Sequence, residues 1–83
     1  GAEQDSIYIT IAADGNIYYE GSEVSPDALN DYLAMRKSEK DRVVALTADR
    51  NLDYNVVREV LEILQQQNFL NVVFMSEQVK ERN

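Results

Sequence analysis

Val43-Val44-Ala45-Leu46-Thr47-Ala48-Asp49-Arg50-Asn51-Leu52-Asp53-Tyr54 is the stretch that decides the fold. It begins with a nearly unbroken apolar run, Val43 to Ala48, which is rich in β-branched side chains. A strand covered on both faces has this composition, because neither face is left for polar residues. A polar turn follows, then an amphipathic segment from Val56 to Leu64 and a second apolar run from Val72 to Met75. Strand, helix and strand at this spacing predict a right-handed βαβ unit.

The first part of the chain predicts a hairpin followed by a helix. Ser6 to Ala12 alternates between isoleucine and more polar residues, which is typical of a half-buried strand. Asp14-Gly15-Asn16 predicts a tight turn, because glycine and asparagine tolerate positive φ, and Ile17 to Glu20 predicts the returning strand. Glu20 to Glu23 is interpreted as the end of that strand. Ser25-Pro26-Asp27 predicts a helix start, with serine as the cap and proline in the first turn.

The second helix has clear signals at both ends. Asp53 stands where an N-cap is expected, and Asn68 is the predicted left-handed residue after the last turn. A final strand is predicted from Asn71 to Ser76. The predicted fold class is therefore α+β, a two-layer sandwich of order ββαβαβ with two helices on one face of a mixed four-stranded sheet. Residues 6–76 are predicted to form one domain, after a disordered lead-in or expression remnant at 1–5 and before a polar tail at 77–83.

Composition excludes several functional classes. The chain has 83 residues and a net charge of −7, which disfavours nucleic acid, whose binders cluster lysine and arginine. It has no cysteine and no histidine, so thiolate chemistry and the most common general base and metal ligand are missing. No stretch has the roughly 18–20 apolar residues of a membrane span. We predict no enzyme activity, no cofactor and no metal site.

The loop from Asp49 to Tyr54 is one candidate site, because it lies at the carboxyl end of a central strand, where open α/β sheets bind ligands. Its two carboxylates, Asp49 and Asp53, could serve acid–base chemistry or bind a hard cation. The structural alternative is that Asp53 caps the helix, Asp49 fixes the turn and Arg50 pairs with one of them. That alternative is favoured, because the demand for an N-cap alone explains Asp53.

The tyrosines of the hairpin form a second candidate site, suited to a protein partner. Tyr8, Tyr18 and Tyr19 lie on strands, and the strand from Ile17 to Glu20 is a candidate sheet edge. An edge presents unpaired peptide groups that can accept a strand from another chain. Tyrosine is also an ordinary strand residue, so a purely structural role is the alternative. The predicted partner-binding residues are Tyr8, Tyr18, Tyr19, Asp49, Arg50 and Tyr54.

Taken in order, several motifs resemble the ExbD/TolR family over about residues 6–76. They are Ile9-Thr10-Ile11-Ala12-Ala13-Asp14-Gly15-Asn16-Ile17-Tyr18, Val24-Ser25, the run from Val43 to Arg50, Leu52-Asp53-Tyr54 and the final helix, turn and strand. The most telling is Ala48-Asp49-Arg50 followed by Asp53-Tyr54. The chain departs from the family at Asn68-Phe69, where glycine is usual, but asparagine can adopt the same left-handed conformation.

The resemblance implies the periplasmic domain of a single-pass inner-membrane protein that transduces proton-motive force. Family members act with an ExbB/TolQ-like channel, reached through a membrane helix absent from this chain, and with a TonB- or TolA-like partner. The family's proton-carrying aspartate lies in that helix, so no aspartate here receives its role. The resemblance also implies homodimerisation. Three interpretations follow: ExbD-like docking of a TonB-like protein, TolR-like binding of peptidoglycan and TolA, or a structural domain without a ligand of its own.

Overall fold

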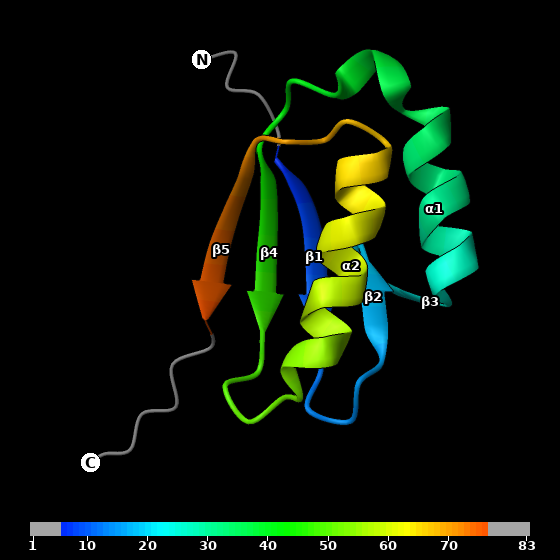
Figure 1. Cartoon of the computed structure of the whole chain (residues 1–83). Helices are drawn as coiled ribbons and strands as arrows, with labels where there is room; N and C mark the ends of the chain where they lie inside the picture. Colours follow the sequence, from blue (N-terminus) through cyan, green and yellow to red (C-terminus); the bar gives the residue numbers. More distant parts are fainter. Residues whose placement is uncertain (1–5, 77–83) are drawn as a thin grey trace.

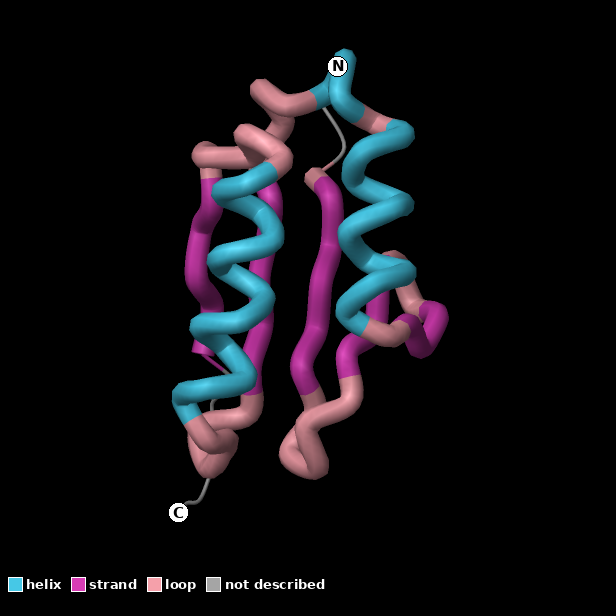
Figure 2. The backbone as a smooth tube through the Cα atoms, turned by 45° about the vertical axis from the view of Figure 1, so that its right-hand side comes forward, coloured by secondary structure: helices cyan, strands magenta, loops and turns pink. Residues whose placement is uncertain are grey.

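A computed structural model of the chain describes residues 6–76, which form a five-stranded sheet with two α-helices on one face (Figures 1 and 2). The strands run in the order β3-β2-β1-β4-β5 across the sheet. The elements are β1 Ile7–Ile11, β2 Ile17–Tyr19, β3 Ser22–Val24, α1 Pro26–Met35, the short 3₁₀ helix η1 Lys37–Glu39, β4 Val44–Ala48, α2 Tyr54–Gln66 and β5 Val72–Ser76. The lead-in and tail predicted at 1–5 and 77–83 lie outside the described residues.

The α+β class, the mixed sheet and the placement of both helices on one face are confirmed. Strands β1, β4 and β5 pair in parallel, whereas β1, β2 and β3 pair antiparallel. The predicted number of four strands is wrong, because β3 adds a fifth.

Strand β3 arises from a turn that the sequence analysis interpreted as a strand end. Glu20 has φ of 51° and Gly21 has φ of 91°, and the flanking residues Tyr19 and Ser22 pair directly. Two consecutive positive φ values are the geometry of a type I′ hairpin turn. The chain therefore reverses and pairs again instead of leaving the sheet. As a result, β2 lies between β1 and β3, and its prediction as a sheet edge is wrong.

The core lies between the sheet and the helices. Ile7, Ile9 and Ile11 are fully buried on the helix-facing side of β1, and each pairs with a buried residue of β4. The other buried apolar residues are Ile17, Leu29, Leu33, Val44, Ala45, Leu46, Ala48, Val57, Val60, Leu64 and Phe69. The opposite face of the sheet has no helix over it in residues 6–76 (Figure 2).

The predicted helix ends are confirmed in their detailed geometry. The Ser25 hydroxyl accepts a hydrogen bond from the Ala28 N–H at 3.1 Å, and the Asp53 carboxylate accepts one from the Asn55 N–H at 2.9 Å. Asn68 has φ of 67°, and the Phe69 N–H then donates to the Leu64 carbonyl at 2.9 Å. This bond is typical of a Schellman helix end. It turns Phe69 into the core and starts the chain toward β5.

Candidate functional site

The six predicted partner-binding residues are divided among three places. Tyr8 on β1 and Tyr18 on β2 lie on the open face of the sheet, where Tyr18 pairs with Thr10. Tyr19 lies on the helix-facing side. Asp49, Arg50 and Tyr54 lie together around the loop between β4 and α2. The structure therefore does not gather all six into one site.

The side chain of Tyr19 makes a ring stack and a hydrogen bond within the fold. Its ring stacks on Tyr32 of α1, with ring centroids 5.1 Å apart and planes 7° from parallel. Its hydroxyl accepts a hydrogen bond from the Arg36 guanidinium at 2.8 Å. Arg36 also donates to the Glu39 carboxylate at 2.7 Å, and this bond lowers the pKa of Glu39. The pKa of Arg36 is raised, first by Glu39 and then by Tyr19. This cluster joins the end of β2 to the end of α1.

The loop between β4 and α2 uses its carboxylates to hold its own backbone. The Asp49 carboxylate accepts a hydrogen bond from the Asn51 N–H at 2.8 Å, and the Asp53 carboxylate caps α2. Arg50 is exposed and makes no hydrogen bond or ion pair with another residue of the range 6–76. The predicted pairing of Arg50 with Asp49 or Asp53 is therefore wrong. Among residues 6–76, the Arg50 guanidinium therefore has no partner, whereas each carboxylate of the loop already accepts a backbone hydrogen bond.

A pocket of about 190 Å³ lies between this loop, the start of α2 and β5. Its lining residues are Ala48, Asp49, Arg50, Leu52, Tyr54, Val57 and Phe74. Tyr54 and Phe74 are large side chains that remain 63% and 52% exposed, so much of each ring is open to solvent. The sequence analysis placed Tyr54 among the binding residues but missed Phe74. The available signal was the uncharged apolar run of β5.

The outer edge of β5 is unpaired within residues 6–76. On its inner side, the Val44 N–H of β4 donates to the Asn71 carbonyl at 2.9 Å. Peptide groups alternate in direction along a parallel strand, so those of Val72 and Phe74 point away from β4. The strand thus offers donors and acceptors to a further strand, and Phe74 belongs both to this edge and to the pocket.

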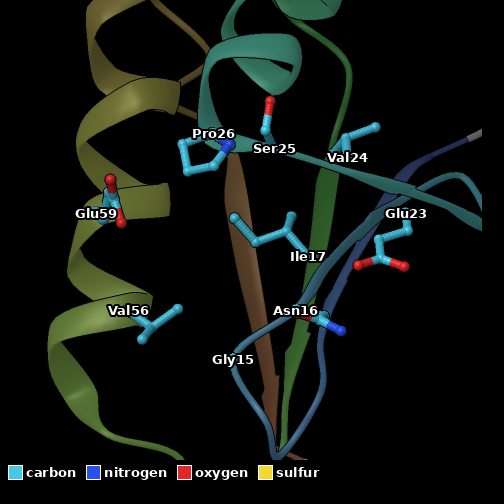
Figure 3. A pocket seen from close by; sticks show the side chains of 9 residues that line it. All are labelled: Gly15, Asn16, Ile17, Glu23, Val24, Ser25, Pro26, Val56 and Glu59. Carbon is cyan, nitrogen blue, oxygen red and sulfur yellow. The ribbon is translucent and has the colours of Figure 1, made fainter.

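A second hollow, of about 510 Å³, opens on the other side of α2, between α2, the start of α1 and the turn between β1 and β2 (Figure 3). Val56 and Glu59 of α2 form one side, and Ser25 and Pro26 form the start of α1 (Figure 3). The remaining lining residues are Gly15, Asn16, Ile17, Glu23 and Val24. Its two glutamates disfavour an anionic ligand, whereas its mixed polar and apolar lining suits a hydrogen-bonding one.

The described part of the chain has neither a cluster of metal ligands nor a membrane-spanning helix. Among residues 6–76, no three Asp or Glu side chains gather closely enough to hold a metal ion. Within the same range, no helix is both long and apolar enough to cross a membrane.

Comparison with known proteins decides the family. Residues 1–78 match the family model described as "Biopolymer transport protein ExbD/TolR". The chain belongs to the ExbD/TolR family. It is 33% identical over 69 residues to the biopolymer transport protein ExbD of Aquifex aeolicus (strain VF5), an alignment that covers 83% of this chain. It spans about half the length, 51%, of that ExbD protein. ExbD/TolR proteins are non-enzymatic components of transport and energy transduction.

Proposed function

We propose that this chain is the periplasmic domain of an ExbD-like transducer of proton-motive force, located in the inner membrane. In this proposal the domain docks a TonB-like protein and so couples an ExbB-like proton channel to transport across the outer membrane. The observation that supports the docking is the outer edge of β5, which is unpaired within residues 6–76. There, the peptide groups of Val72 and Phe74 point outward beside an exposed aromatic ring and a pocket.

The chemistry of this edge supports an extended peptide as the ligand. In strand addition, main-chain hydrogen bonds supply much of the affinity, and pockets for alternate side chains supply specificity. Strand β5 offers both elements over its five residues, none of which is charged. The side chains Val73 and Met75 are also exposed, at 47% and 42%, on the face away from the helices. A docked strand could extend contact across this apolar surface.

Two further features of the proposal concern the complete protein. Contact with the channel would be made through a membrane helix outside this chain, and two copies would act together as a homodimer. The free edge of β5 is compatible with either a second copy or a TonB-like segment as its occupant. The partner titration below is therefore done at a domain concentration at which the chain is shown to be monomeric by sedimentation.

An amide ¹H–¹⁵N NMR titration with the periplasmic linker of the TonB-like protein encoded beside this chain tests the proposal. We expect saturable shifts at Val72, Phe74 and neighbouring β5 amides, together with shifts around Arg50. Shifts confined to β3 or to the hollow of Figure 3 would contradict docking at β5. An absence of shifts at millimolar peptide would contradict peptide docking by this domain.

A TolR-like role in the cell wall is a second candidate, supported by the hollow beside α1. Its lining combines Asn16, Ser25, Glu23 and Glu59 with apolar side chains, which suits hydrogen-bonded glycan or peptide groups. Co-sedimentation with purified peptidoglycan tests this role, and in this interpretation the partner would be TolA-like. Sedimentation that is lost in Glu59→Gln would support it, whereas a domain that stays in the supernatant would exclude it.

A further inference from the structure

The pocket beside β5 has the size of one aromatic side chain. Its volume is about 190 Å³, whereas an engineered apolar cavity of about 150 Å³ binds benzene. Its apolar lining comes from Ala48 and Leu52 at the end of β4 and in the loop, and from Val57 on the first turn of α2. Val57 and Ala48 are buried, so this part of the pocket is held rigidly by the core.

The pocket also lies where a docked strand would deliver a side chain. The peptide group of Phe74 points to the free edge, so a strand added there pairs with Phe74. Residues directly opposite each other on paired strands lie on the same face, with Cβ atoms about 5 Å apart. Phe74 faces the helix side, because it is in register with the buried Leu46 of β4. The partner residue opposite Phe74 therefore reaches the pocket.

Three lining side chains favour an aromatic occupant over an aliphatic one. Phe74 and Tyr54 expose ring surface on two sides of the pocket, and aromatic pairs gain energy beyond the apolar area that they bury. Arg50 supplies a guanidinium without a partner among residues 6–76, and a guanidinium is attracted to the face of an aromatic ring. Methyl groups offer neither kind of contact.

We propose that this pocket holds one aromatic side chain of the docked segment, the residue that pairs with Phe74, and that this residue selects the segment. The inference rests on the proposed docking at β5 and specifies the chemistry of its ligand. The occupant is an extended peptide with Phe, Tyr or Trp at one fixed position. Main-chain pairing holds the segment along the edge, and the pocket determines its register.

Synthetic peptides with one guest residue test the inference directly. The probe is a set of capped nonapeptides of alternating Thr and Lys, with Phe, cyclohexylalanine, Leu or Ala as the central guest. Cyclohexylalanine matches Phe closely in size and apolar character but has no π system. We expect the Phe peptide to bind about tenfold more tightly than the Ala peptide and several-fold more tightly than the cyclohexylalanine peptide.

Amide shifts in the same titrations separate this inference from the proposed function. Edge docking requires shifts at Val72 and Phe74 with every guest, whereas anchoring requires guest-dependent shifts at Tyr54 and Val57. Equal affinities with the edge shifts retained would overturn the anchor pocket and leave edge docking standing. Shifts at Tyr54 and Val57 without shifts at Val72 and Phe74 would overturn strand addition at β5. They would also overturn the pairing of the guest residue with Phe74. An absence of binding by all four peptides would overturn both.

Variants of one exposed tyrosine and a matched control complete the test. Tyr54→Ala should reduce the preference for Phe over Ala from about tenfold to about threefold, whereas Tyr54→Phe should keep it, because only the ring is required. Met35→Ala removes an exposed apolar side chain, 77% exposed, from the end of α1 and should leave the preference unchanged. A preference that survives Tyr54→Ala intact would contradict the proposed geometry.

Discussion

The two edges of the sheet differ in length, charge and covering. Strand β3 has three residues, includes Glu23 and continues through Ser25 into α1. Strand β5 has five residues, Val72–Ser76, and carries no charge. Natural proteins protect edges by keeping them short, charged or covered, because a free apolar edge can pair with another chain. The β3 edge has this protection, whereas within residues 6–76 the β5 edge lacks it, and this difference supports the proposed docking at β5.

The aromatic side chains near the two edges show the same contrast. Near β3, Tyr19 is stacked on Tyr32 and hydrogen-bonded to Arg36, so its interactions are completed within the fold. Near β5, Tyr54 and Phe74 line a pocket and remain more than half exposed. A tyrosine that is already paired contributes to stability, whereas one beside an open pocket is available for recognition. The predictions below separate these two roles.

The largest expected effect comes from proline at the free edge. Phe74→Pro removes an outward N–H and the ring beside the pocket, and should weaken binding of the TonB-like linker about a hundredfold. Glu23→Pro is the matched control, because in the alternating ladder its N–H also points away from β2. We expect that variant to bind with unchanged affinity. The two affinities can be measured by isothermal titration, with circular dichroism to verify folding.

The opposite result would reassign the docking site. If Glu23→Pro weakens binding while folded Phe74→Pro does not, the partner uses the β3 edge. If neither folded variant changes the affinity, docking does not use strand addition at either edge.

The next largest effect is on stability and differs between Tyr19, which is paired within the fold, and Tyr54, which lies beside the pocket. Tyr19→Ala removes the stacked ring and the acceptor for Arg36, and should lower the free energy of unfolding by about 2 kcal/mol. Tyr54→Ala should change it by no more than about 0.5 kcal/mol, because the ring is largely exposed. Urea denaturation of both variants gives the comparison. A cost at Tyr54 equal to that at Tyr19 would show that its ring is structural.

A smaller effect on stability is expected at Asp53, which caps the start of α2 beside the pocket. Asp53→Ala removes the acceptor for the Asn55 N–H and should cost about 1 kcal/mol of stability. Asp53→Asn should restore most of it, because asparagine is an equally good N-cap. Thermal or urea unfolding distinguishes these variants. A neutral Asp53→Ala would mean that the cap does not set the position of Tyr54.

Local signals in the sequence were sufficient for most of the fold. The apolar run before Asp49, the cap at Asp53 and the left-handed Asn68 each act within a few residues, and each predicted its element correctly. Strand β3 was missed because it depends on Glu20 adopting positive φ, which is uncommon for a residue with a Cβ atom. That single turn also changes which strand is at the edge.

The candidate site was harder to predict because it depends on contacts between distant parts of the chain. Asp49, Arg50 and Tyr54 were selected from one loop, and they do lie around one pocket. Phe74 joins that pocket from a strand 20 residues after Tyr54, through the parallel pairing of β4 with β5. Sequence alternation could not show that the outer edge of β5 is unpaired within residues 6–76. Only the strand order across the sheet reveals it.

The smallest effect is the pH dependence of stability at Glu39, which pairs with Arg36 beside Tyr19. The hydrogen bond from Arg36 lowers the pKa of Glu39 below its usual value of 4.5 in the folded state. The carboxylate therefore contributes stability that is fully present above about pH 4.5 and is lost as the pH falls through the lowered pKa. Glu39→Gln should reduce stability slightly at pH 7, and this reduction should shrink as the pH falls through the lowered pKa.

Urea unfolding of the wild type and Glu39→Gln at several pH values measures this dependence. Glu59→Gln is the matched control, because Glu59 is exposed and no hydrogen bond or ion pair joins it to the rest of residues 6–76. Its stability at pH 7 should differ little from that of the wild type. A difference for Glu39→Gln that stays constant from pH 7 to pH 2 would show that the Arg36 pair does not contribute. The cluster around Tyr19 would then rest on its stacked rings and on the hydrogen bond from Arg36 to the Tyr19 hydroxyl.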